Sequence, residues 1–156
     1  SEKQTAQLDS GFYALLSGNA EAARSPIAKF FDPKDKSPME WAMAGRLKLL
    51  EGDRAAAAAD FNKAHRFEDE QNAGEELPPI PVGEIEAFGY YHSGDYRNAE
   101  TIFRRTLKDF PNDPRALYGL SLTLQKSGRL DEAQRIAGDF HRQWQGADMS
   151  LSLNAL

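Results

Sequence analysis

The chain has 156 residues, and its 40% hydrophobic content is enough for a continuous core and argues against general disorder. Its 28% charged residues are mixed along the chain and sum to −5, which disfavours binding to nucleic acid or anionic lipid. The absence of cysteine excludes disulfides, thiolate metal sites and cysteine nucleophiles.

No apolar run approaches the roughly 20 residues that cross a bilayer, and the first ten residues contain no apolar signal core. We therefore expect a soluble protein without membrane insertion. Cysteine usage leaves its compartment open between cytoplasm and periplasm.

Four similar short stretches follow one another along the chain. They are "LLSGNAEAA", ending at Ala23, "LLEGDRAAA", ending at Ala57, "YHSGDYRNA", ending at Ala99, and "LQKSGRLDEA", ending at Ala133. Their glycines are residues 18, 52, 94 and 128, so the intervals are 34, 42 and 34 residues. This spacing predicts an internal repeat with extra residues in its middle interval.

Each repeated glycine lies between two segments in which apolar residues are spaced three or four positions apart. This spacing predicts two amphipathic helices. A glycine at the end of the first helix can adopt a left-handed conformation without steric cost. Asn19, Asp53 and Asp95 follow, and their side chains can cap the second helix. The expected unit is helix, glycine turn, helix.

In chain order, the expected repeats cover about 4–37, 38–67, 80–113 and 114–147. Pro26 is expected to kink or restart the second helix of the first repeat near Ser25. Residues 68–81 combine acidic residues, Gly74 and three prolines, which predicts an insertion loop. The tail over 148–156 is apolar at alternate positions and could either cap the array or dock a partner.

The repeated alanines are expected where two helices approach so closely that only a small side chain fits. The large apolar residues of the repeats have a similarly structural interpretation, as core residues rather than ligand contacts. They include Trp41, Phe61, Phe103 and Leu120.

This period and pattern resemble the tetratricopeptide repeat. The second repeat carries most of the likeness, with Trp41, Ala44, Gly45, Gly52, Ala57, Phe61 and Ala64. The resemblance implies an all-α fold, a right-handed superhelix of about four antiparallel helix pairs. The second half, from "EELPP" through "HRQWQGADMSL", resembles the C-terminal module of larger bacterial proteins of this family.

In this family the first helix of each repeat lines a concave surface, and the resemblance implies which positions face it. Exposed aromatic and arginine side chains on such a surface are typical anchors of protein interfaces. The predicted groove residues are Phe12, Arg46, Glu84, Phe88, Tyr91, His92, Arg115, Tyr118, Leu122 and Gln125.

No motif in the sequence points to catalysis, a metal or a cofactor. His65, His92 and His141 lie in three different repeats without metal-ligand spacing, and His65 and His141 are interpreted as helix-end residues. The chain also lacks phosphate-binding glycine motifs and a nucleophile elbow.

The leading hypothesis is a non-enzymatic scaffold that binds a peptide or protein in the concave groove. The residue pattern that clamps the tails of heat-shock chaperones in some relatives is not reproduced. One alternative is an accessory or regulatory module of a larger bacterial protein, which could itself be an enzyme. Another is self-association into a homo-oligomer through the end repeats.

Overall fold

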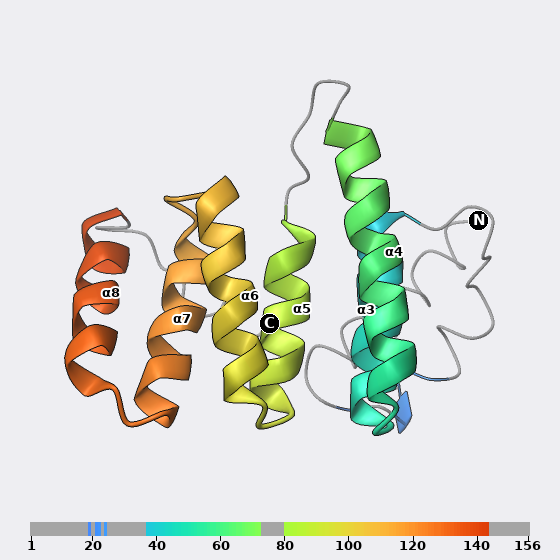
Figure 1. The fold of residues 1–156 in the computed structure, drawn as a ribbon, viewed down its shortest axis with the longest axis horizontal. Helices are drawn as coiled ribbons and strands as arrows, with labels where there is room; N and C mark the ends of the chain where they lie inside the picture. The colour runs from blue at the N-terminus through green and yellow to red at the C-terminus, as the bar shows by residue number, and fades with distance from the viewer. Residues whose placement is uncertain (1–18, 20, 23, 25–36, 73–79, 144–156) are drawn as a thin grey trace.

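Three helical hairpins follow one another in the computed structural model, which describes residues 19, 21–22, 24, 37–72 and 80–143 (Figure 1). The first hairpin consists of α3 (Pro38–Leu50) and α4 (Arg54–Asn72). The second consists of α5 (Val82–His92) and α6 (Tyr96–Asp109), and the third of α7 (Pro114–Lys126) and α8 (Leu130–Gln143). Within these described ranges all regular structure is helical, as the sequence predicted.

The turn inside each hairpin depends on a glycine with positive φ. Gly52, Gly94 and Gly128 have φ values of 83°, 80° and 77°, a region that other residues occupy only at a steric cost. At the first turn, the amide of Asp53 donates to the carbonyl of Lys48 at 2.9 Å, and that of Gly52 donates to Leu49 at 3.0 Å. These two hydrogen bonds form a Schellman motif, so the predicted turn is confirmed.

The predicted helix caps are also present. Asp53 Oδ1 accepts from the amide of Ala56 at 3.0 Å, and Asp95 Oδ1 accepts from Asn98 at 3.2 Å. In the first repeat, Asn19 Oδ1 accepts from Ala22 at 3.0 Å. The rest of that repeat, including its expected kink at Pro26, lies outside the described residues, as does the tail.

The core lies between the two helices of each hairpin and between neighbouring hairpins. Helix α5 contacts α3, α4, α6 and α7, and α6 also packs against α7. The repeated alanines at 57, 99 and 133 are fully buried, as their expected close packing requires. The predicted core residues Trp41, Phe61, Phe103 and Leu120 are all buried.

The predicted insertion loop is shorter than expected at its start. Residues 68–72 belong to α4, which ends at Asn72. Glu68 has a specific role there, because its Oε2 accepts a hydrogen bond from the backbone amide of Val82 at 2.7 Å. This bond caps the beginning of α5 from the preceding repeat, so α4 gains a tertiary contact by extending beyond residue 67.

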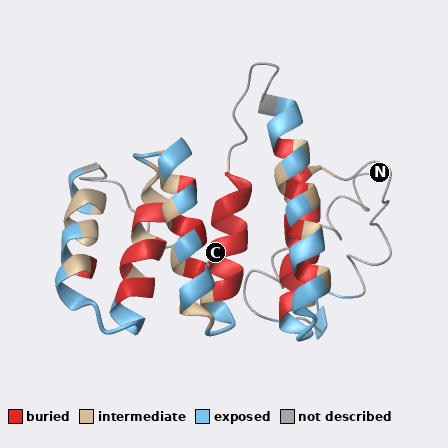
Figure 2. Cartoon of the chain, viewed as in Figure 1, coloured by how far each residue is buried: buried red, intermediate tan, exposed pale blue. Residues whose placement is uncertain are grey.

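Helix α5 is enclosed to an unusual degree. Every residue from 81 to 90 is buried, whereas α6 mixes buried and exposed positions and α8 is mostly half-buried or exposed (Figure 2). A helix that is buried all round requires neighbours on every side.

Candidate protein-binding face

The predicted groove residues lie on the first helices of the three described repeats. We call them the first-helix face: Arg46 of α3, then Glu84, Phe88, Tyr91 and His92 of α5, and Arg115, Tyr118, Leu122 and Gln125 of α7. Phe12 lies outside the described residues.

Members of this face differ widely in exposure. Arg46, Glu84 and Phe88 are buried, with 4%, 0% and 2% of their surface exposed. His92 and Gln125 are exposed. The remaining four, which are half-buried, are Tyr91, Arg115, Tyr118 and Leu122.

The aromatic residues of the face connect it to the core and to the neighbouring hairpin. The ring of Phe88 meets that of Phe103 on α6 edge to face at 5.0 Å, so Phe88 packs into the core. Burial, together with the phenols of Tyr96 and Tyr118, raises the pKa of Tyr91. Tyr91 of α5 and Tyr118 of α7 are therefore close enough for their phenols to influence one another.

Arg46 presents a buried cation on α3. Its stem lies against Gly89 of α5, and among the described residues its Nη1 atom has no hydrogen-bond partner. Burial lowers the pKa of Arg46 to about 10, which still leaves the guanidinium protonated at neutral pH. A buried charged group without a partner costs several kcal/mol of folding free energy or acquires a partner by binding.

Glu84 presents a buried carboxyl group in the first turn of α5. Neither of its carboxyl oxygens has a partner in hydrogen-bonding geometry in the described part of the chain. Burial raises the pKa of Glu84 to about 10, reinforced by hydrogen bonding to the Asp113 carboxylate and by its negative charge, and opposed by Arg115. The group is therefore protonated at neutral pH and can both donate and accept a hydrogen bond.

Arg115 supplies the third such group, at the start of α7. Its side chain is half-buried, and its Nε atom is buried without a partner within the described ranges. Its position follows from the cap of α7, where Asp113 Oδ1 accepts from the amides of Arg115 and Ala116 at 3.0 and 3.2 Å. Each of the three first helices thus contributes one polar side chain with a buried atom that has no hydrogen-bond partner among the described residues.

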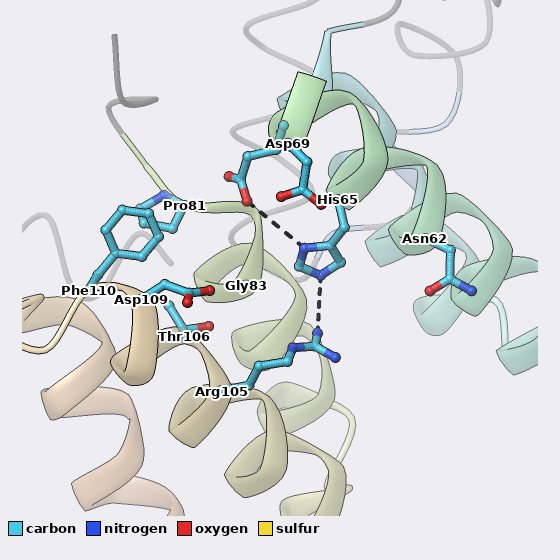
Figure 3. Close-up of a pocket in the computed structure, with 10 residues that line it drawn as sticks. Asn62, His65, Asp69, Pro81, Gly83, Arg105, Thr106, Asp109 and Phe110 are labelled. Atoms are coloured by element: carbon cyan, nitrogen blue, oxygen red, sulfur yellow. Dashed lines mark hydrogen bonds and ion pairs between the residues drawn. The ribbon is translucent and has the colours of Figure 1, made fainter. Parts of the chain in front are cut away.

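A polar pocket of 290 Å³ lies elsewhere, between α4, α6 and the start of α5 (Figure 3). His65 lies in the middle of α4 rather than at a helix end, and its Nε2 is 2.5 Å from Glu86 Oε2 and 3.2 Å from Arg105 Nη2. Sequence analysis missed this cluster because its members come from three helices. The pairing already satisfies these side chains, so the pocket offers no unpartnered buried group.

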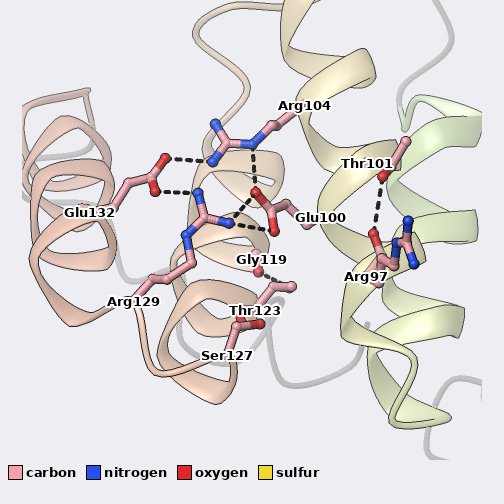
Figure 4. A network of polar contacts seen from close by, with 9 residues as sticks. All are labelled: Arg97, Glu100, Thr101, Arg104, Gly119, Thr123, Ser127, Arg129 and Glu132. Carbon is pink, nitrogen blue, oxygen red and sulfur yellow. Dashed lines mark hydrogen bonds and ion pairs between the residues drawn. The ribbon is translucent and has the colours of Figure 1, made fainter.

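A second polar cluster ties α6 to α8 (Figure 4). Arg129 Nη1 donates to both carboxylate oxygens of Glu100 at 2.8 and 2.9 Å, and Arg104 Nη2 donates to Glu132 at 2.5 Å. These residues are 28 or 29 positions apart in sequence, so only the folded arrangement reveals them. The cluster links α6 to the beginning of α8 and to the turn that precedes it.

The part of the chain that the structure describes contains neither a metal-binding cluster nor a membrane-spanning helix. There, no three or more His, Asp or Glu side chains are grouped so as to hold a metal ion. None of the described helices combines the length and apolar character needed to span a membrane.

Comparisons with known proteins complete this description. A search of the curated proteins found no match to the chain. The solved structure of MamA AMB-1 is similar at 15% sequence identity, covering 97% of each chain with a TM-score of 0.41. Residues 90–139 match the family model described as the tetratricopeptide repeat. The matched segment covers α6, α7 and most of α8, and the helical hairpins with their repeated glycine turns agree with a fold of this kind.

Proposed function

We propose that this protein is a non-enzymatic scaffold that binds an extended segment of a partner protein across the first-helix face. One observation carries the proposal. Arg46, Glu84 and Arg115 lie on three neighbouring first helices, and each keeps a buried polar atom without a partner among the described residues. Buried polar groups in folded proteins are nearly always paired, so three on one face favour a bound ligand.

The chemistry of these groups defines the ligand. Both guanidinium groups can only donate, so the ligand must offer acceptors to Arg46 and Arg115. An extended peptide presents backbone carbonyl oxygens at regular intervals, and an acidic side chain would form a charge-assisted hydrogen bond with an arginine.

Apolar contact would come from the half-buried residues of the same face. Tyr91, Tyr118 and Leu122 can each cover an apolar side chain of the ligand. We therefore expect a preference for peptides that combine one carboxylate with spaced apolar residues. The exposed His92 and Gln125 would lie at the rim of the contact.

Selection from a phage-displayed library of random peptides tests this proposal. The immobilised chain should enrich acidic, apolar-containing sequences, and the double variant Arg115→Gln with Tyr118→Ala should capture them at least about tenfold more weakly. Arg97→Gln, on the exposed surface of α6, is the matched control and should bind as the unmodified chain does. Equal capture by the double variant, with its helical circular dichroism intact, would remove the first-helix face as the binding surface.

A further inference from the structure

Two tyrosines of the first-helix face have rings that are held in place by other rings. Near the end of α5, the ring of Tyr91 is 5.6 Å from that of Tyr96 and 5.4 Å from that of His92, measured between centroids. On α7, the ring of Tyr118 is 5.5 Å from that of Phe140 on α8. We call Tyr91 and Tyr118 the tyrosine pair. Contacts of this kind orient the rings before a ligand arrives, so a ligand that packs on them orders little further structure.

The tyrosine pair connects two neighbouring first helices. Helices α5 and α7 are in contact, and the pKa of Tyr91 is raised by burial and then by the phenols of Tyr96 and Tyr118. Leu122 lies one turn beyond Tyr118 on α7 and is half-buried as well. An aromatic and apolar surface therefore passes from α5 to α7.

The polar groups beside the tyrosine pair are chiefly hydrogen-bond donors. Neither phenol hydroxyl has a hydrogen-bond partner within the described ranges, and Arg115, one turn before Tyr118, can only donate. The carboxylate of Asp113 already accepts from two backbone amides at the start of α7. The surface is therefore best matched by a segment that has many acceptors and few N–H groups.

A proline-rich segment has this composition. Proline has no backbone N–H, and the polyproline II conformation forms no internal hydrogen bonds, so all of its carbonyl oxygens are available. Its pyrrolidine rings dock on aromatic side chains, and its conformation exists before binding. One turn of polyproline II advances about 9 Å, which is comparable to the 8–10 Å between the axes of packed helices. Successive turns can therefore contact successive first helices.

We propose that the partner segment is proline-rich and binds the first-helix face in the polyproline II conformation. Proline rings pack on the tyrosine pair, and the two phenol hydroxyls donate to backbone carbonyls of the segment. An acidic residue between the prolines pairs with Arg115. This inference rests on the proposed function and narrows its ligand from extended peptides in general to one backbone conformation.

Two fluorescein-labelled synthetic peptides of equal length and charge test the proposal. The first contains three pairs of prolines with one glutamate between two of the pairs. In the second, valine and threonine alternate in place of the prolines, which restores the N–H groups and favours a β conformation. Fluorescence anisotropy should show that the proline peptide binds at least about tenfold more tightly.

Substitutions at Tyr118 separate the contribution of its ring from that of its hydroxyl. Tyr118→Leu retains an apolar side chain and should bind the proline peptide about tenfold more weakly, whereas Tyr118→Phe should lose only about threefold. Arg97→Gln on the exposed surface of α6 is the control and should bind as the unmodified chain does. Helical circular dichroism verifies the folding of each variant.

Nuclear magnetic resonance of a proline peptide with ¹³C-labelled pyrrolidine rings tests the ring contact directly. Ring protons of proline that lie over a tyrosine ring should shift upfield in the complex. The shift should be smaller with Tyr118→Leu and unchanged with Arg97→Gln. A complex without any upfield shift would overturn the proposal, because the prolines would not pack on the tyrosine pair.

The peptide measurements also distinguish this proposal from the proposed function. Equal or tighter binding of the valine–threonine peptide, weakened by the double variant Arg115→Gln with Tyr118→Ala, would overturn the polyproline conformation and leave the proposed function intact. Binding of either peptide that this double variant does not weaken would place the contact elsewhere and reject both.

Two further results would overturn the polyproline proposal. If neither peptide binds, enrichment of proline-free acidic peptides by phage selection would preserve the proposed function alone, and a selection without any enrichment would reject both. Sedimentation that shows a dimer of the chain, dissociated by Tyr118→Leu but not by the proline peptide, would assign the tyrosine pair to a second copy.

Discussion

Arg46 and Gly89 are in close contact across the interface between α3 and α5. A Cβ atom at residue 89 would lie 3.1 Å from Cγ of Arg46 and 3.2 Å from Cδ1 of Leu49. The missing side chain at Gly89 therefore determines where the buried guanidinium lies. The proposed binding face therefore depends on Gly89, although this glycine is not among the predicted contact residues.

We expect Gly89→Ala to shift the stem of Arg46 and to weaken binding of the selected peptide about tenfold, equivalent to roughly 1.4 kcal/mol. Stability should change little, because the higher helix propensity of alanine offsets the crowding. Fluorescence anisotropy with the labelled peptide measures the affinity, and urea denaturation the stability. Unchanged affinity would show that Arg46 keeps its position or contributes nothing to the contact.

Removing the buried charge should separate stability from binding. Arg46→Met retains an apolar stem, so the free energy of unfolding is expected to stay equal or to rise by about 1 to 4 kcal/mol. The affinity for the selected peptide should decrease, because the variant lacks the guanidinium donors of Arg46. Arg66→Met, at an exposed position on α4, is the control and should change neither quantity appreciably. A clear loss of stability in Arg46→Met alone would indicate that the guanidinium is paired within the fold.

Glu84 predicts an unusual dependence of stability on pH. Its pKa is raised from 4.5 to about 10 in the folded chain, so the native state retains a proton that the unfolded state loses. The stabilisation is complete below pH 4.5 and is lost as the pH rises towards 10, with a slope of about 1.4 kcal/mol per pH unit.

Glu84→Gln should abolish this contribution between pH 6 and about pH 9, so its stability relative to the unmodified chain should increase with pH. Urea denaturation at several pH values measures the slope, with Glu70→Gln on the exposed surface of α4 as the control. Parallel pH profiles for Glu84→Gln and the unmodified chain would mean that Glu84 is ionised in the fold.

Two helical glycines should respond in opposite directions to alanine. A Cβ atom at Gly119 would lie 2.2 Å from Cζ of Phe103, which is fully buried and has little room to move. Gly119→Ala is therefore expected to destabilise the fold by about 1 to 3 kcal/mol.

At Gly138 the nearest atom would be 3.6 Å away, at the flexible end of Arg142. Gly138→Ala should therefore stabilise the fold by up to about 1 kcal/mol. Thermal unfolding of both variants measures the difference, and equal effects would refute the packing of α7 against Phe103.

Local features of the fold could be predicted from sequence because their causes are local. A glycine followed by Asp53 or Asp95 determines a left-handed turn and a helix cap whatever the surroundings. The end of α4 could not be predicted in the same way. Its helical residues after 67 are supported by the contact of Glu68 with Val82, fourteen positions further along the chain.

For the candidate site, the helix on which each residue lies could be predicted from sequence, but its burial and its hydrogen-bond partners could not. Repeat spacing placed Arg46, Glu84 and Arg115 on first helices, which is where they lie. Their burial and their unused donors depend on what packs above them, and a repeat pattern carries no such information. The pairing of His65 with Glu86 was equally invisible, because side chains from separate helices approach only after folding.

The nearly equal φ values of Gly52, Gly94 and Gly128 have a consequence for what distinguishes the hairpins from one another. Because the turns share one local geometry, the two helices of every hairpin leave their glycine in the same way. What distinguishes one hairpin from the next therefore lies in the contacts between hairpins, such as the hydrogen bond from Val82 to Glu68. Exchanging one glycine turn for another should leave the fold unchanged, whereas exchanging whole hairpins would break these contacts.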